Sequence, residues 1–241
     1  MPGYVSHTIM ARDIYKKLGN KKINLDYMLT FSLGGDLSKY SRCRYDTHHT
    51  KQEEFIMRMV KYIKENNLTT DGEVLGVLYG HICHYVMDKI MHPLVYKIDK
   101  SCIKNKKNHT LIEGYIDNYL VNYKYHYMVD KYNNNEIFKG KVNKKVAKML
   151  DTVYLDVYNA KRISLYYKFN LWLYKKIKYL YKILGINLLK KISGYNKFRN
   201  NNRNITLDSD IIKVYNDSVN EAYGYISRLL QKREITPTDV Q

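Results

Sequence analysis

The apolar residues of this chain recur at intervals of three and four almost from end to end. In the first segment Val5, Ile9, Ile14 and Leu18 are spaced roughly as one face of a helix. Segments 55–66, 70–93, 111–131, 144–158 and 208–232 continue it. Such a period places the apolar residues on one face of a helix, whereas the alternation typical of strands is scarce. The sequence therefore predicts an all-α fold.

Two signals predict where the central helix begins and ends. Thr70 and Glu73 have the spacing of a capping box, which is expected to start the helix. Pro93 is expected to end it, because the residue before a proline avoids the helical region. Loops are expected at 34–35, 38–50, 98–108, 133–135 and 200–204.

Length and composition limit the organisation of the chain. Its 241 residues fit a single domain over 1–241, with a metal-site half at 1–120, a basic amphipathic segment at 161–199 and a C-terminal helix at 208–232. Three cysteines at irregular spacing exclude a disulfide scaffold. The start of the chain has no signal-peptide pattern, and no apolar run reaches membrane-spanning length. We therefore expect a cytoplasmic or peripheral membrane protein.

The chain is strongly basic, with 41 Lys and Arg against 23 Asp and Glu and a formal net charge of +18. Such a charge suits nucleic acid or an anionic membrane equally well. It also follows from a composition rich in Lys, Asn, Ile and Tyr, with no anionic partner selected. Charge alone therefore does not choose a partner, and no protein partner can be inferred.

Segment 161–199 mixes Leu, Ile, Tyr and Trp172 with Lys and Arg and contains no acidic residue. One interpretation is a helix that lies on an anionic membrane, with its aromatic rings at the level of the head groups. The other is a surface helix of the bundle whose lysines extend over its apolar side. The sequence leaves both open.

Histidines and carboxylates are spaced so that they share helix faces. His84, Asp88 and His92 follow one another at intervals of four, and His109 and Glu113 repeat that interval. Side chains four apart stack on one face of a helix. Imidazole with carboxylate is the ligand set of hydrolytic zinc sites. Upstream candidates are Asp36, His48 and His49.

Together these motifs resemble the zinc-dependent phospholipases C. That family shares its fold with the catalytic domain of glycosylphosphatidylinositol-specific phospholipase D and, more distantly, with the S1/P1 nucleases. The resemblance covers about residues 1–120 and rests, in order, on MPGYVSH, GGDLSKY, HH, GHICHYVMDKIMHP and HTLIEGYID. It implies a multi-helix bundle of the phospholipase C/P1 nuclease type, with a zinc cluster in a cleft.

The resemblance also implies which residues hold zinc. It assigns one zinc to Asp36, His48 or His49, His84 and Asp88, and a second to His92, His109 and Glu113. A third ion would be held by His7 and Asp88, so that two and up to three zinc ions bind. Secreted members complete that third site with a mature N-terminal Trp. Here the chain starts Met1-Pro2, so either the third site is weak or absent, or the Pro2 amine takes that place once Met1 is removed.

Other residues receive secondary assignments. Asp36 and Asp88 are the catalytic candidates, with Asp36 as ligand, general base or both. His81 and Lys39 are candidates for binding the substrate phosphate, although a packing or supporting role is favoured for His81. Cys83 is expected in the core, and His126 on a helix surface.

The resemblance favours a zinc-dependent phosphodiesterase that hydrolyses phospholipid head groups, with a phospholipid or membrane surface as its partner. The first alternative is an S1/P1-like nuclease on the same scaffold, with nucleic acid as the partner. The second is a bundle that binds metal or membrane without turnover. Aromatic side chains around the cleft would favour bases, whereas an apolar rim would favour lipid.

Overall fold

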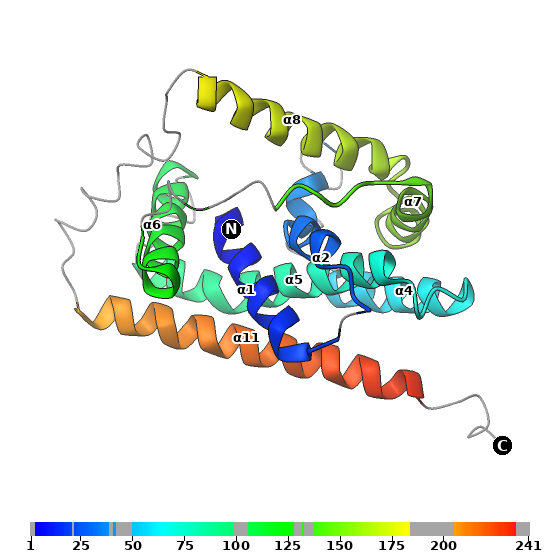
Figure 1. Cartoon of the computed structure of the whole chain (residues 1–241), viewed down its shortest axis with the longest axis horizontal. Helices are drawn as coiled ribbons and strands as arrows, with labels where there is room; N and C mark the ends of the chain where they lie inside the picture. The colour runs from blue at the N-terminus through cyan, green and yellow to red at the C-terminus, as the bar shows by residue number, and fades with distance from the viewer. Residues whose placement is uncertain are drawn as a thin grey trace.

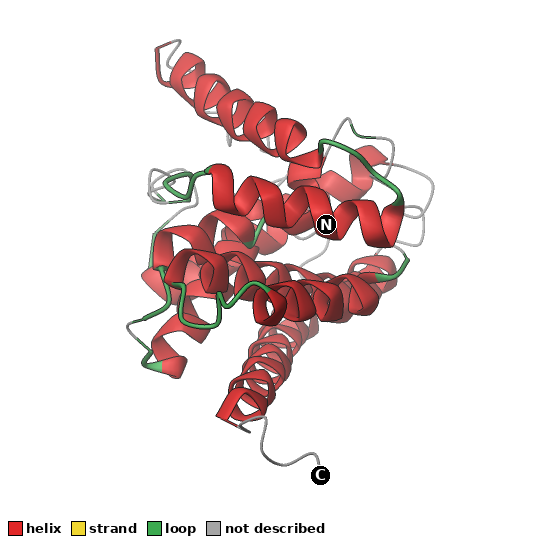
Figure 2. Cartoon of the chain, turned by 90° about the vertical axis from the view of Figure 1, so that its right-hand side faces the viewer, coloured by secondary structure: helices red, strands yellow, loops and turns green. Residues whose placement is uncertain are grey.

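In the part of the chain that the computed structural model describes, all regular secondary structure is helical, joined by loops, with no strand there (Figures 1 and 2). The predicted all-α class is therefore confirmed. The structure describes residues 3–20, 22–38, 41, 50–98, 106–127, 132, 137–183 and 205–234. Its elements are α1 (Tyr4–Leu18), α2 (Leu25–Phe31), η1 (Gly34–Ser38), α4 (Gln52–Glu65), α5 (Gly72–Ile98), α6 (Lys106–Tyr125), α7 (Lys144–Tyr158), α8 (Ile163–Ile183) and α11 (Ile205–Glu234).

Helix α5 lies at the centre of the arrangement, and α2 and α11 make its most extensive contacts (Figure 1). Helices α1, α4, α6 and α7 also contact it. A single cluster of buried apolar side chains includes residues of α1, α5, α8 and α11. Functional side chains on α5 are therefore held by packing on several sides.

The start of α5 differs from the predicted capping box. Oδ1 of Asp71 accepts hydrogen bonds from the backbone N–H groups of Glu73 and Val74, both at 3.1 Å. The cap is thus Asp71 rather than Thr70. A carboxylate at this position satisfies otherwise unpaired donors of the first turn.

Pro93 does not end the helix, as the sequence predicted, because α5 continues through it to Ile98. A proline inside a helix costs about 3 kcal/mol. The next two residues, Leu94 and Val95, are 6% and 0% exposed. Burying each contributes about 1.5–3 kcal/mol, which offsets that cost.

Two short elements near the start of the chain were not predicted. Helix α2 was missed, and the expected loop at Gly34 and Gly35 is the beginning of the 3-10 helix η1. Elsewhere the helical periodicity located the elements, and α7 has the predicted bounds. Helix α6 begins at Lys106, inside the expected loop 98–108, and ends at Tyr125, before the predicted end at residue 131. Among the described helices, none combines the length and the hydropathy that crossing a bilayer requires.

Candidate metal centre

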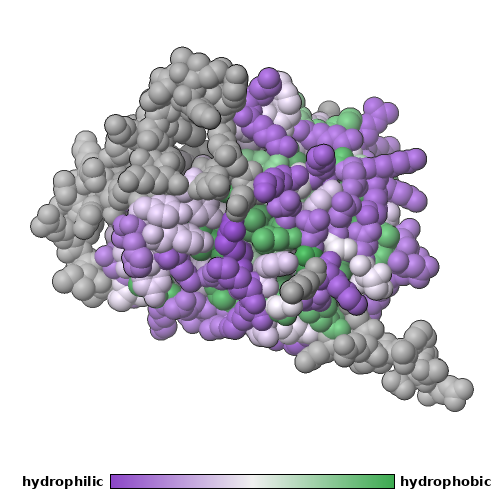
Figure 3. Space-filling view, viewed as in Figure 1, coloured by the Kyte–Doolittle hydropathy of each residue, from purple (hydrophilic) through white to green (hydrophobic). Residues whose placement is uncertain are grey.

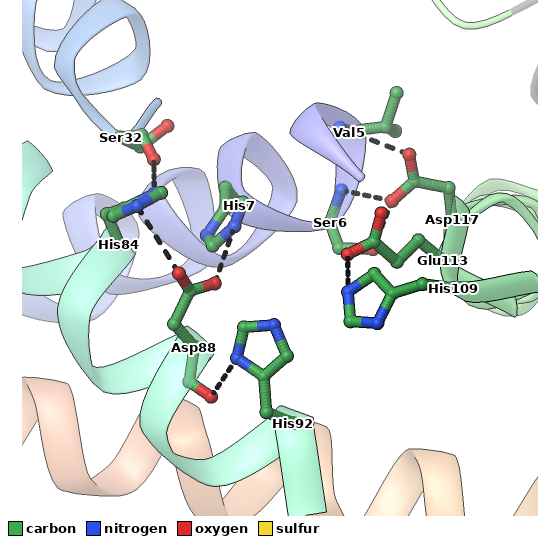
Figure 4. A network of polar contacts seen from close by, with 10 residues as sticks. All are labelled: Val5, Ser6, His7, Ser32, His84, Asp88, His92, His109, Glu113 and Asp117. Atoms are coloured by element: carbon green, nitrogen blue, oxygen red, sulfur yellow. Dashed lines mark hydrogen bonds and ion pairs between the residues drawn. The ribbon is translucent and has the colours of Figure 1, made fainter. Parts of the chain in front are cut away.

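Helices α1 and α5 bring together three predicted ligands, His7, His84 and Asp88, which the resemblance had divided between the first and the third zinc ion (Figure 4). They form the first of two groups. His84 and Asp88 lie one turn apart on α5, and His7 comes from α1. Nε2 of His7 lies 3.3 Å from Oδ1 of Asp88, and Nε2 of His84 lies 3.4 Å from Oδ2. All three side chains are buried. One carboxylate therefore contacts two imidazoles through its two oxygens.

The second group, His92, His109 and Glu113, joins the next turn of α5 to α6 (Figure 4). Nε2 of His109 lies 2.7 Å from Oε1 of Glu113. The rings of His92 and His109 are stacked, with their centroids 5.5 Å apart. In each of the two groups, the potential ligand atoms lie within 4.8 Å of one another.

Backbone carbonyls fix the orientation of two of these imidazoles. Nδ1 of His84 lies 3.2 Å from the carbonyl oxygen of Ser32, and Nδ1 of His92 lies 2.9 Å from that of Asp88. Because a carbonyl only accepts, each Nδ1 carries the proton, and each Nε2 keeps its lone pair. Zinc-binding histidines are commonly held in this way.

Burial keeps the second group in the form that binds metal. Removal from water disfavours the charged imidazolium and lowers the pKa of His92 to about 4. Burial likewise lowers the pKa of His109 to about 4. Both rings are therefore neutral near pH 7, as metal ligation requires.

The polar groups of the first site fit a metal ion. His7 is 0% exposed, and apart from the contact of its Nε2 with Oδ1 of Asp88, neither of its ring nitrogens makes a hydrogen bond to the described residues. Burying polar groups with so few hydrogen bonds costs free energy, which a cation between His7, His84 and Asp88 would recover. Two imidazoles and a carboxylate form the donor set of catalytic zinc sites such as that of thermolysin. Both groups offer this set.

A carboxylate that sequence reasoning missed, Asp117 on α6, holds α1 in place (Figure 4). Its Oδ1 accepts from the backbone N–H of Ser6 at 2.8 Å, and its Oδ2 from that of Val5 at 3.4 Å. These donors belong to the first turn of α1, directly before His7. Asp117 thus continues the four-residue interval of His109 and Glu113, and this spacing could have revealed it.

The chain matches the family model for zinc-dependent phospholipase C over residues 6–162. This span contains both ligand groups and more than half of the chain. The chain belongs to the zinc-dependent phospholipase C family. No curated protein and no solved structure matches it.

The family match extends beyond the resemblance seen in the sequence, which ended near residue 120. It includes α7 and stops at Arg162, directly before α8. Helices α8 and α11 therefore lie outside the segment that identifies this phospholipase C family member. Their roles are inferred from their contacts in the structure.

Helix α8 supports the turn that carries Asp36. The Tyr167 hydroxyl donates to the carbonyl of Gly34 at 3.1 Å, and the Asn170 side-chain amide donates to that of Leu37, also at 3.1 Å. These two hydrogen bonds bracket Asp36 in η1. The side chain of Asp36 is buried. It does not belong to either of the two groups of potential metal ligands found among the described residues. Its assignment as ligand or general base stays a prediction.

Both ring nitrogens of His81 lie close to polar atoms inside the protein. Its Nδ1 lies 2.8 Å from the Val77 carbonyl oxygen, and its Nε2 lies 3.0 Å from the Tyr167 hydroxyl. Burial lowers the pKa of His81 to about 4, so the ring is neutral. With its one proton on Nδ1, the neutral ring has no N–H to offer a phosphate. This geometry favours the supporting role.

The remaining predicted residues are placed as follows. His48, His49 and Lys39 lie outside the described residues. Cys83 is buried, as predicted, and burial raises the pKa of its thiol. His126 is exposed, directly after the end of α6.

Proposed function

We propose that this protein is a zinc-dependent phosphodiesterase that hydrolyses phospholipid head groups in the manner of a phospholipase C. One observation carries the proposal: two groups, each of two imidazoles and a carboxylate, lie within the segment that matches the family. His7, His84 and Asp88 would hold one zinc ion, and His92, His109 and Glu113 a second.

The protein's own residues prepare this site for a phosphodiester. When bound, zinc acts as a Lewis acid toward a phosphoryl oxygen and makes water acidic enough to attack phosphorus near neutral pH. Asp88 contacts His7 and His84 with separate oxygens and so sets their spacing. The Ser32 carbonyl orients His84, and the Asp88 carbonyl orients His92.

A small pocket lies beside His84. Its volume is about 20 Å³, and Phe55, Tyr85 and Tyr154 are among its lining residues. A space of this size holds about one water molecule. The rings of Phe55 and Tyr154 pack edge to face, with centroids 4.8 Å apart, and both are buried. Neither of these two rings offers an open face to a nucleotide base, and a pocket of this size admits neither a base nor a lipid head group, so the substrate panel below decides between the two substrates.

Metal analysis and a substrate panel test this proposal. We expect at least two zinc ions per chain by mass spectrometry and release of a phosphorylated head group from phosphatidylcholine or phosphatidylinositol. Hydrolysis of single-stranded DNA or RNA alone would establish the nuclease alternative. Fewer than two zinc ions, or binding of zinc without turnover of any diester, would overturn the proposal.

Asp88→Asn is the matching variant. A neutral amide oxygen binds zinc much more weakly than a carboxylate does, so we expect loss of zinc from the first group and loss of activity. Asp210→Asn is the control, since Asp210 pairs with Lys97 on the surface at 3.3 Å. Full activity in Asp88→Asn would show that the site assignment is wrong.

A further inference from the structure

Helix α8 carries apolar side chains on two opposite faces. Its inner face packs into the bundle through Tyr167 and Leu171, which are 0% and 5% exposed. Its outer face carries Leu165, Phe169 and Trp172, which are 55%, 49% and 53% exposed. A surface helix of a bundle needs only the inner stripe. Packing among the described residues therefore does not explain the outer face.

The three outer residues form one continuous group. Their intervals of four and three place them on the same side of the helix. The rings of Phe169 and Trp172 lie 6.0 Å apart between centroids. Most of the described surface on the face drawn in Figure 3 is hydrophilic, with apolar residues in small groups. Large exposed apolar groups of this kind mark interaction sites.

Positive charge surrounds this group and indicates what covers it. Lys168, Lys175 and Lys176 of α8 are exposed beside it, and Lys161 and Arg162 are exposed directly before the helix. No acidic residue occurs between Asp156 and Asp208. A second copy of the chain would bring like charges together. An apolar stripe with Trp, flanked by lysines, has the composition of helices that lie in the interface of anionic membranes.

We propose that the outer face of α8, formed by Leu165, Phe169 and Trp172 with its flanking lysines, docks the protein on an anionic lipid bilayer. Over residues 163–176 the structure shows a helix packed into the bundle, as the second interpretation expects. The proposal adds to it the membrane contact of the first interpretation.

The inner face of the same helix connects this surface to the metal centre. Tyr167 and Asn170 hold the carbonyls of Gly34 and Leu37 in η1. The side of Gly34 on which a Cβ would stand lies against the ring of His84. Docking would bring η1 within about one helix diameter, 10–12 Å, of the lipid surface. The inference that docking brings the metal centre close to its lipid substrate rests on the proposed function.

Trp172 makes the test direct, because it is the only tryptophan in the chain. The full protein is titrated with vesicles of phosphatidylserine and phosphatidylcholine, and separately with vesicles of phosphatidylcholine alone. We expect a blue shift of tryptophan emission, and quenching by lipids brominated on their acyl chains, with the anionic vesicles. Added salt should weaken this binding because it screens the lysines.

Three variants separate the contributions. Replacing Leu165 and Phe169 by Ser should weaken vesicle binding at least tenfold. Replacing Lys168 and Lys175 by Gln should weaken it about fivefold for each residue. Met57→Ser is the matched control, because Met57 is 51% exposed but lies on α4, and its binding should be unchanged.

Zinc content and hydrolysis of the soluble diester bis(4-nitrophenyl) phosphate separate docking from the proposed function. The Leu165 and Phe169 double variant should keep both while losing vesicle binding. A Trp172 emission that no vesicle shifts, or a double variant that binds as well as the parent, would overturn docking even if the diester is hydrolysed. Vesicle binding without diester hydrolysis would support docking and count against the proposed function.

Discussion

Gly34 is the position where a single added carbon should disturb the metal centre most directly. Its φ of +46° lies in the left-handed region, and a Cβ there would come within 2.3 Å of Cγ of His84. Contacts this short do not occur, so the imidazole or η1 must move. His84 has little freedom to move, because its Nδ1 is hydrogen-bonded to the carbonyl oxygen of Ser32 and its ring centroid lies 4.5 Å from that of His7.

The expected loss of stability in Gly34→Ala has two parts. A residue with a side chain in the left-handed region costs about 1–2 kcal/mol. Forcing an extra carbon into packed surroundings adds about 1–3 kcal/mol. In a chain of this size each kcal/mol lowers the melting temperature by roughly 2–4 °C. We therefore expect a decrease of about 10 °C.

The variant Gly19→Ala measures the backbone cost of the left-handed region by itself. Gly19 ends α1 with a φ of +61°, and a Cβ there would meet nothing within 4 Å. This variant should show only the backbone cost, a decrease of about 5 °C.

Thermal unfolding in EDTA compares the two variants without metal, and mass spectrometry then measures the zinc that each retains after dialysis. Gly34→Ala should retain less zinc than the parent, whereas Gly19→Ala should retain as much. Equal losses of stability in the two variants, with parental zinc in Gly34→Ala, would refute the argument.

Three further variants test the supporting residues. Asp117→Ala should lower the free energy of unfolding by about 1–2 kcal/mol through loss of the α1 cap, and should weaken zinc binding through His7; urea denaturation and zinc titration check both effects. Tyr167→Phe leaves the Gly34 carbonyl without its donor and should cost about 1–3 kcal/mol, with a matching rise in the zinc dissociation constant. His81 has a pKa of about 4 when folded and about 6.5 when unfolded, so acid favours the unfolded chain and stability is lost as the pH falls through this interval. The metal-free parent should lose about 2 kcal/mol from this group between pH 7 and pH 5, and a His81→Gln variant that loses as much over the same interval would contradict this assignment.

The sequence determined what depends on local spacing. Apolar residues at intervals of three and four set the helices, because that period matches the turn of the α-helix. The same local rule placed His84 with Asp88, and His109 with Glu113, before any fold was known. Spacing also put His92 on the face of His84 and Asp88, but only the family resemblance assigned it to a second ion.

The tertiary structure decided what depends on contacts between distant segments. His7 reaches Asp88 because α1 packs on α5, and His92 joins His109 because α6 meets α5 one turn further on. Pro93 stays inside α5 because the residues after it are buried, which no rule based on neighbouring residues includes. The supporting bonds from Tyr167 and Asn170 to η1 span 133 residues each and follow no periodic signal. Likewise, periodicity showed that α8 is amphipathic, but only the packed bundle decided which of its apolar residues stay exposed.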